Sequence, residues 1–206
     1  MNQIEKLIIQ FTQRRIKQLY PSKASLAKLR RGIGKKMGEM PELLGFTLPE
    51  EGFSPYTTQE EQIEQALYTA ITLYAFHQQG QDACVSISGT NDEQATTKRR
   101  NSFGYAMQRL SSCVNTEDTV LRRFNKVMTA NSLEELATHV RSLIGLMKQH
   151  KIMLDYPLFA VALYRFQQPE FRRSVVLGWG KDYYMGKESN LVICKAHFSK
   201  VLQANP

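Results

Sequence analysis

The chain has 206 residues, of which 42% are hydrophobic; this share excludes a disordered chain and is enough to bury one core or two small ones. Lys and Arg number 27 against 19 Asp and Glu, which gives a formal net charge of +8 and favours a polyanionic partner such as nucleic acid, with solubility alone as the alternative. Three cysteines without a CxxC pair argue against a secreted disulfide framework.

A first helix is predicted from about Asn2 to Leu19, because apolar residues recur there at helical spacing before Pro21 ends the pattern. Its basic polar face also fits a membrane surface, an alternative that the Gln-rich character of that face disfavours. The charged residues among its apolar positions exclude a signal-peptide core or a membrane span. We therefore expect a cytoplasmic protein.

The charge is divided along the chain. Residues 1–36 hold ten Lys or Arg and one acidic residue, whereas residues 37–97 hold ten acidic residues and no Lys or Arg. Residues 98–206 hold seventeen basic and eight acidic residues. The acidic stretch suits either packing against a basic partner or ordinary solvation.

The remaining elements are also helical in pattern. A second helix is predicted from about Ser25 to Arg31, ending at two nearby glycines, and a third ends near His77. Polar residues dominate from 79 to 100, which predicts a mobile connector. Further helices are predicted at about 102–112, 117–129, 133–149, 156–166, 170–185 and 191–202, with Gly178-Trp179-Gly180 interrupting the helix from residue 170.

The predicted fold is therefore all-α, with two small helical bundles joined by the polar connector. The N-terminal helical domain covers residues 1–100 and includes the connector at about 79–100. The C-terminal bundle covers residues 101–206.

No residue set typical of catalysis stands out. The histidines are dispersed without the spacing of metal ligands, at positions His77, His139, His150 and His197. Gly32 and Gly34 lack the preceding strand and the Lys-Ser/Thr pair of a phosphate-binding loop. We expect no catalytic residue, no metal site and no cofactor.

Two successive predicted helices each combine an apolar stripe with a cationic edge. Arg122, Arg123 and Lys126 lie opposite the apolar residues of the helix that begins at residue 117. Arg141 and Lys148, seven residues apart, flank the apolar stripe of the next helix. Such a surface suits phosphates, with an affinity that depends on salt and is indifferent to base sequence.

Several segments, in order and spacing, resemble one known family. They are LAKLRRGIGKKMGEMP (Leu26–Pro41), AITLYAFH (Ala70–His77), SFGYAMQRL (Ser102–Leu110), and Leu121–Tyr184 with its RRF, LDY and RR-x5-W-x3-YY elements. On these residues the chain resembles the CasB family, the small subunits of the type I-E CRISPR surveillance complex Cascade. The resemblance implies N- and C-terminal helical bundles, no active site and two stacked copies. It also implies contacts with the other Cascade subunits and their guide RNA, and basic grooves that stabilise the DNA strands of the R-loop.

The resemblance also implies binding residues. Arg30 and Arg31 match the paired arginines of the family's LRRG element, Arg109 matches a later arginine, and the basic helices carry Arg122, Arg123 and Arg141. Charge and helical position add Lys35, Lys36, Lys126, Lys148 and Arg165 to the predicted nucleic-acid-binding set. Arg172 and Arg173 also match, with helix capping or contacts between copies as alternative roles.

The sequence departs from the family pattern in three places. Phe103 stands where Leu is usual, Tyr156 stands where Trp is common, and a polar insert near Cys84–Thr97 has no counterpart. None of these changes removes a cation from the predicted surface. The competing interpretation is a free-standing helical regulator that binds nucleic acid, with the helix from Glu117 reading a DNA groove.

Overall fold

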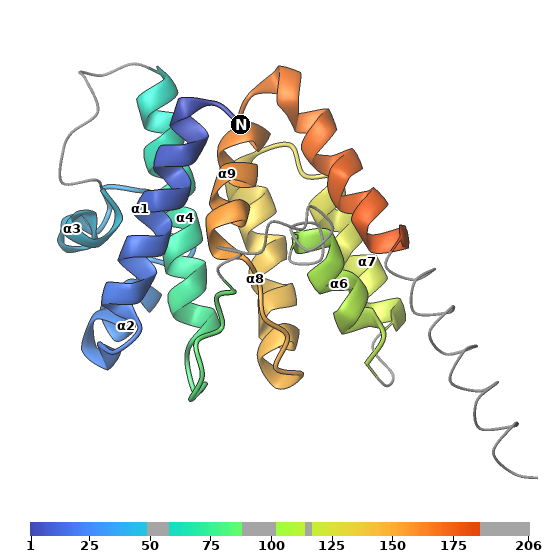
Figure 1. Ribbon diagram of the computed structural model, residues 1–206, viewed down its shortest axis with the longest axis horizontal. Helices are drawn as coiled ribbons and strands as arrows, with labels where there is room; N and C mark the ends of the chain where they lie inside the picture. Colours follow the sequence, from blue (N-terminus) through green and yellow to red (C-terminus); the bar gives the residue numbers. More distant parts are fainter. Residues whose placement is uncertain (49–57, 88–101, 114–116, 186–206) are drawn as a thin grey trace, which may run out of the picture.

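The computed structural model describes residues 1–48, 58–87, 102–113 and 117–185. In these residues the regular secondary structure is helical, apart from an isolated β-bridge between Ser86 and Leu154. The helices stand in a row, from α1, α2 and α3 at one end to α6, α7 and the last helix at the other (Figure 1). The predicted all-α fold class is confirmed.

The helices follow the predicted order. Their bounds are α1 Gln3–Leu19, α2 Lys23–Arg30, α3 Leu44–Thr47 after a 3-10 turn at Pro41–Leu43, α4 Thr58–His77, α6 Phe103–Ser111, α7 Glu117–Met128, α8 Leu133–Gln149 and α9 Tyr156–Phe166. A last helix covers residues 169–185. Among the described helices, none is both long and apolar enough to cross a membrane.

Side-chain caps fix where five of these helices begin. At α1, Asn2 accepts a hydrogen bond from the backbone N–H of Glu5 at 2.9 Å, and the Glu5 carboxylate accepts one from the N–H of Asn2 at 3.1 Å. Equivalent bonds are accepted at α2, α6, α8 and α9 by Ser22, Ser102, Ser132 and Asp155. Each cap satisfies a backbone donor that the first helical turn leaves unpaired.

The structure differs from the predicted helices in two places. The 3-10 turn and α3 were not predicted, because segments of three or four residues are too short to produce a periodic pattern. The last helix runs through Gly178-Trp179-Gly180 without interruption. Trp179 is buried and packs against Phe103 and Phe159, which offsets the weak helix propensity of the two glycines. The helix predicted at 191–202 lies outside the described residues.

One hydrophobic core joins helices from both predicted bundles. α9 packs against α1 and α4, and α4 also packs against α8. Ile8 of α1, Tyr74 of α4 and Phe159 of α9 belong to the same buried cluster. The two predicted bundles are thus in direct contact, and the domain division at residue 100 stays a prediction.

The first residues of the predicted connector are held in place. The Gln78 side-chain amide donates to the carbonyls of Gln81 and Ala83 at 3.0 and 2.8 Å, and its oxygen accepts from the N–H of Val85 at 3.0 Å. The carbonyl of Val85 then accepts from the N–H of Leu154 at 3.1 Å. The prediction of a mobile connector is therefore wrong for residues 79–87, and residues 88–100 lie outside the described part.

α6 and the last helix touch backbone to backbone. A Cβ atom at Gly104 would overlap the carbonyl oxygen of Trp179 and lie 2.9 Å from the Cβ of Asp182. The hydroxyl of Ser102 donates to the Asp182 carboxylate at 2.6 Å. Glycine is required at residue 104 because any side chain would push the last helix off α6.

Candidate nucleic-acid interface

The turn after α2 brings several predicted cations toward α4. Gly32 is buried under Leu43 and Tyr68, and the Tyr68 hydroxyl donates to the Gly32 carbonyl at 3.0 Å. Gly34 has φ +77°, a conformation that residues with a Cβ rarely adopt. The two glycines thus let the chain turn tightly after Arg30 and lie against the middle of α4.

Two cations of α8 lie over one aromatic ring of α4, and a third cation at the end of α2 is close enough to repel one of them. The Arg141 guanidinium and the Lys148 ammonium group, both on α8, lie 5.6 and 4.6 Å from the centre of the Phe76 ring on α4. Burial lowers the pKa of Lys148, and the positive charge of Arg30 lowers it further. We call Arg30, Arg141 and Lys148 the α8 cation cluster.

The α8 cation cluster lacks acidic partners among the described residues. Lys148 donates to the side-chain oxygen of Gln79 at 3.2 Å, a neutral group, and no described carboxylate forms an ion pair with any of the three cations. Like charges held together without counter-charges repel one another. The arrangement therefore favours an external anion, and the Phe76 ring beneath Arg141 and Lys148 helps to hold these two cations in position.

The neighbouring cations on the turn are more exposed. Lys35 lies 3.8 Å from the carboxylate of Glu39, with more than half of its side chain accessible. Arg31 and Lys36 are also exposed. A surface ion pair such as that of Lys35 contributes about 0–1 kcal/mol, so it leaves this lysine available to a stronger anion.

The cations of α7 divide into two kinds. Arg122 and Lys126 are exposed, and Arg122 bonds only within its own helix, to the carbonyl of Asp118 at 3.3 Å. Arg123 instead crosses to α8, where it donates to the carbonyl of Ser142 at 3.0 Å. α7 and α8 pack together, so the predicted cations of both helices lie on neighbouring elements, as the sequence indicated.

Two further predicted residues make internal contacts. Arg109 is half-buried and donates to the carbonyl of Met153 at 2.9 Å, and burial lowers its pKa. Arg165 forms an ion pair with Glu5, with contacts of 2.7 and 2.6 Å to one carboxylate oxygen. These contacts give both arginines a structural role, and a role for them in nucleic-acid binding stays a prediction.

Other basic and aromatic residues are also used inside the protein. Arg172 donates to the carbonyl of Phe166 at 3.1 Å and so caps the end of α9, as its helix-capping alternative predicted, while Arg173 is exposed. Phe103 and Tyr164 are buried and offer no face for base stacking. Phe76 was missed, because it follows the apolar stripe of α4 and gives no sign of the cations that cover it.

The histidines give no indication of catalysis. His77 is buried, with its Nδ1 atom 3.1 Å from the hydroxyl of Tyr156, and burial lowers its pKa to about 4. His139 lies 3.8 Å from Glu135 on the same helix. In the described residues, no group of three or more His, Cys, Asp or Glu side chains has the geometry of a metal site.

Solved structures that resemble this chain include CasB proteins and a chain of a CRISPR complex. CasB from Thermobifida fusca is 26% identical, with a TM-score of 0.70 over 89% of this chain and 98% of that chain. CasB from M. ruber is 18% identical, with a TM-score of 0.65 over 94% and 99% of the two chains. A chain of a CRISPR RNA-guided surveillance complex is 18% identical, with a TM-score of 0.63 over 91% and 99%. A search of curated proteins found no match.

The family assignment rests on a match over most of the chain. Residues 25–184 match the model of the CRISPR-associated protein Cse2 family. These residues run from the first turn of α2 to the end of the last described helix, and they contain every predicted binding residue. The chain belongs to the CRISPR-associated protein Cse2 family.

Proposed function

We propose that this chain is the non-catalytic small subunit of a type I-E Cascade complex. In this role it binds the other Cascade subunits with their guide RNA, the target DNA strands and a second copy of itself. It stabilises the R-loop that forms when the guide pairs with target DNA. Family membership and the similarity to CasB structures support this role.

The observation that carries the proposal is the α8 cation cluster. Arg141 and Lys148 lie over the Phe76 ring, the charge of Arg30 acts on Lys148, and none of the three has an acidic partner among the described residues. Holding such a cluster in place costs electrostatic energy in the free protein. A phosphate backbone relieves that cost by supplying counter-charge and releasing its condensed counterions.

The proposed mechanism is electrostatic capture of DNA strands after guide pairing has begun. Arg30, Arg141 and Lys148 hold one stretch of backbone, and the exposed Arg122 and Lys126 on α7 extend the contact. These side chains contact phosphates and not base edges, so binding is independent of sequence. Target specificity remains with the guide RNA, and the small subunit shifts the balance toward the unwound state.

The test is reconstitution with a guide-loaded complex that lacks its small subunit. Affinity for a matched target duplex is measured by fluorescence anisotropy with and without this chain, at two salt concentrations. Permanganate reactivity of thymines in the displaced strand reports unwinding in the same samples. The proposal predicts a salt-sensitive gain in affinity together with greater thymine reactivity.

The opposite result is equally informative. If the chain neither joins the complex nor changes target affinity, the small-subunit function is wrong. Salt-tolerant binding of the isolated chain to one duplex sequence would instead support the free-standing regulator.

A further inference from the structure

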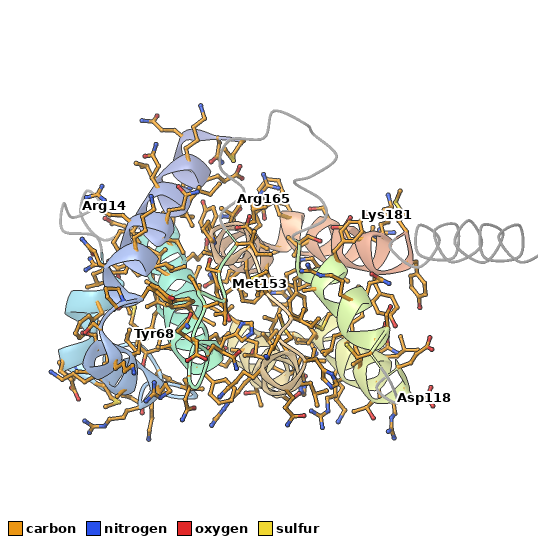
Figure 2. All side chains as sticks on the ribbon, turned by 60° about the horizontal axis from the view of Figure 1, so that its bottom comes forward. Arg14, Tyr68, Asp118, Met153, Arg165 and Lys181 are labelled. Carbon is orange, nitrogen blue, oxygen red and sulfur yellow. The ribbon has the colours of Figure 1, made fainter. Side chains whose placement is uncertain are left out.

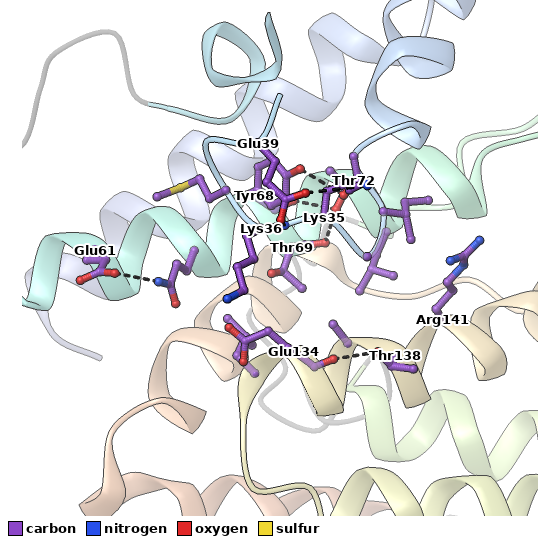
Figure 3. A pocket seen from close by; sticks show the side chains of 18 residues that line it. Lys35, Lys36, Glu39, Glu61, Tyr68, Thr69, Thr72, Glu134, Thr138 and Arg141 are labelled. Atoms are coloured by element: carbon purple, nitrogen blue, oxygen red, sulfur yellow. Dashed lines mark hydrogen bonds and ion pairs between the residues drawn. The ribbon is translucent and has the colours of Figure 1, made fainter. Parts of the chain in front are cut away.

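A pocket of about 610 Å³ lies between the turn after α2, α4 and α8. Its size is in the range of ligand-binding pockets. Apolar groups line it where α4 and α8 approach each other, from Leu73 on one helix and from Leu133 and Ala137 on the other. Figure 3 shows the side chains that surround it.

The wall formed by the turn is already fixed. Tyr68 holds the carbonyl of Gly32 at 3.0 Å. The carboxylate of Glu39 accepts from the backbone N–H of Lys36 at 3.1 Å. A pocket whose walls are held by internal bonds binds a partner without a large cost in ordering.

The pocket has an acidic end. Two of the residues that line it, Glu61 and Glu134, lie in the first turns of α4 and α8. Helix N-termini favour acidic side chains, which explains why both carboxylates are tolerated there. Neither carboxylate forms an ion pair with a described cation. Glu61 accepts a hydrogen bond from the Gln65 side chain at 3.0 Å, and the Glu134 carboxylate has no partner among the described residues.

This acidic end is a poor place for a nucleic acid. Phosphates approaching Glu61 and Glu134 meet two carboxylates of like charge, whereas the α8 cation cluster offers a favourable site farther along α8. Lys36 reaches from the opposite wall toward Glu134 in Figure 3, but no ion pair forms between them. The apolar lining and the carboxylates together fit a cationic side chain next to an apolar one.

We infer that this pocket holds a segment of a protein partner in which a Lys or Arg side chain pairs with Glu61 and Glu134 and an adjacent apolar side chain packs against Leu133 and Ala137. The inference rests on the proposed function, since it assumes that the chain joins a complex of several proteins. Arg141 lines the far part of the pocket and also belongs to the α8 cation cluster. A docked partner would thus lie directly beside the proposed DNA path.

The test uses the same guide-loaded complex without its small subunit, and no target DNA. Binding of the full-length chain is measured by biolayer interferometry for the wild type, for Glu61→Gln with Glu134→Gln, and for Glu117→Gln with Asp118→Asn. The control pair removes the same charge from the first turn of α7, outside the pocket. We expect about ten-fold or weaker binding for the pocket variant and a change of less than about two-fold for the control.

The direction in which a third variant changes the binding affinity distinguishes a basic occupant from an anionic one. Lys36→Ala removes a cation that competes for Glu134, so a basic protein segment should bind as well or better, whereas an anionic occupant should bind more weakly. Weaker binding of Lys36→Ala would therefore overturn the inference. The inference would also be overturned if the Glu61→Gln, Glu134→Gln variant kept the wild-type melting temperature and bound as tightly as the wild type. The small-subunit function would stand in that case. Absence of wild-type binding would instead count against the small-subunit function itself.

Discussion

The ion pair between Arg165 and Glu5 predicts a large effect on stability from a residue that charge alone assigns to DNA binding. Glu5 lies on α1 with 4% of its side chain accessible, and Arg165 lies on α9 with 41% accessible. The guanidinium makes two short contacts to one carboxylate oxygen. The other oxygen caps the N-terminus of α1, so one buried carboxylate holds both the start of α1 and its contact with α9.

The cost of Arg165→Met follows from this geometry. Removing one partner of a buried ion pair costs about 3–5 kcal/mol. Arg165 is partly exposed and water can reach Glu5 after truncation, which reduces the expected cost to about 2 kcal/mol. For a chain of this size, that loss lowers the melting temperature by about 4–8 °C. Glu5→Gln leaves a neutral side chain that still accepts the Asn2 hydrogen bond, so the double variant should recover at least half of the loss.

The assay is thermal and urea unfolding of the wild type, both single variants and the double variant. A coupling free energy of about 1–2 kcal/mol between the two positions is expected from the cycle. DNA affinity of the assembled complex should be unchanged for the double variant. If Arg165→Met leaves stability unaltered but weakens DNA binding, Arg165 contacts the ligand and the structural role is wrong.

Three further predictions concern other parts of the molecule. Gly104→Ala should lower the free energy of unfolding in urea by about 1–3 kcal/mol, because the new Cβ meets the backbone of the last helix. Gly145→Ala, which has open space around it in α8, should raise the free energy of unfolding by about 0.4–1 kcal/mol. Equal effects of the two variants would refute the close packing of α6 on the last helix. The pKa of His77 is lowered to about 4 by burial, so the unfolded chain binds a proton that the folded chain rejects, and stability should fall as the pH drops from about 6.5 toward 4. His77→Gln should flatten that part of the urea-unfolding profile, and an unchanged slope would contradict it. Arg123→Ala should lower the free energy of unfolding by about 1 kcal/mol, because its hydrogen bond to α8 is lost. Arg122→Ala should weaken DNA binding without lowering the melting temperature. The reverse pattern would make Arg122 the structural residue and Arg123 the DNA contact.

Sequence periodicity and capping residues were sufficient for most of the fold. α8 and α9 have the predicted bounds because each begins at a side-chain cap, Ser132 or Asp155, and carries a clear apolar stripe. The last helix was misjudged because local propensity counts two glycines as breaks, whereas burial of Trp179 against distant aromatic residues decides the outcome. Residues 79–87 were misjudged for a related reason, since their hydrogen bonds to Gln78 and Leu154 depend on tertiary contacts.

The candidate site was less predictable than the fold. Charge and helical position picked out Arg141 and Lys148, and the family resemblance picked out Arg30. Nothing in the sequence indicated that Arg141 and Lys148 both lie over Phe76 or that Arg30 acts on Lys148. Sequence also gives the same weight to a cation that faces solvent and to one held by an internal carboxylate, as Arg165 is by Glu5. Only the packing of α1 against α9, which places Glu5 beside Arg165, shows that this arginine is of the second kind.

A phosphate site on α8 is tested by the salt dependence of target-DNA binding by the reconstituted complex, compared between two matched double variants. Arg141→Ala with Lys148→Ala removes two members of the α8 cation cluster. Arg14→Ala with Lys181→Ala removes the same residue types from exposed positions at opposite ends of the molecule (Figure 2). We expect the first pair to weaken binding at every target sequence and to reduce the slope of log affinity against log salt by about one to two units. The control should keep the wild-type slope. A wild-type slope for the cluster variant, or an equal reduction in the control, would contradict a localised phosphate site on α8.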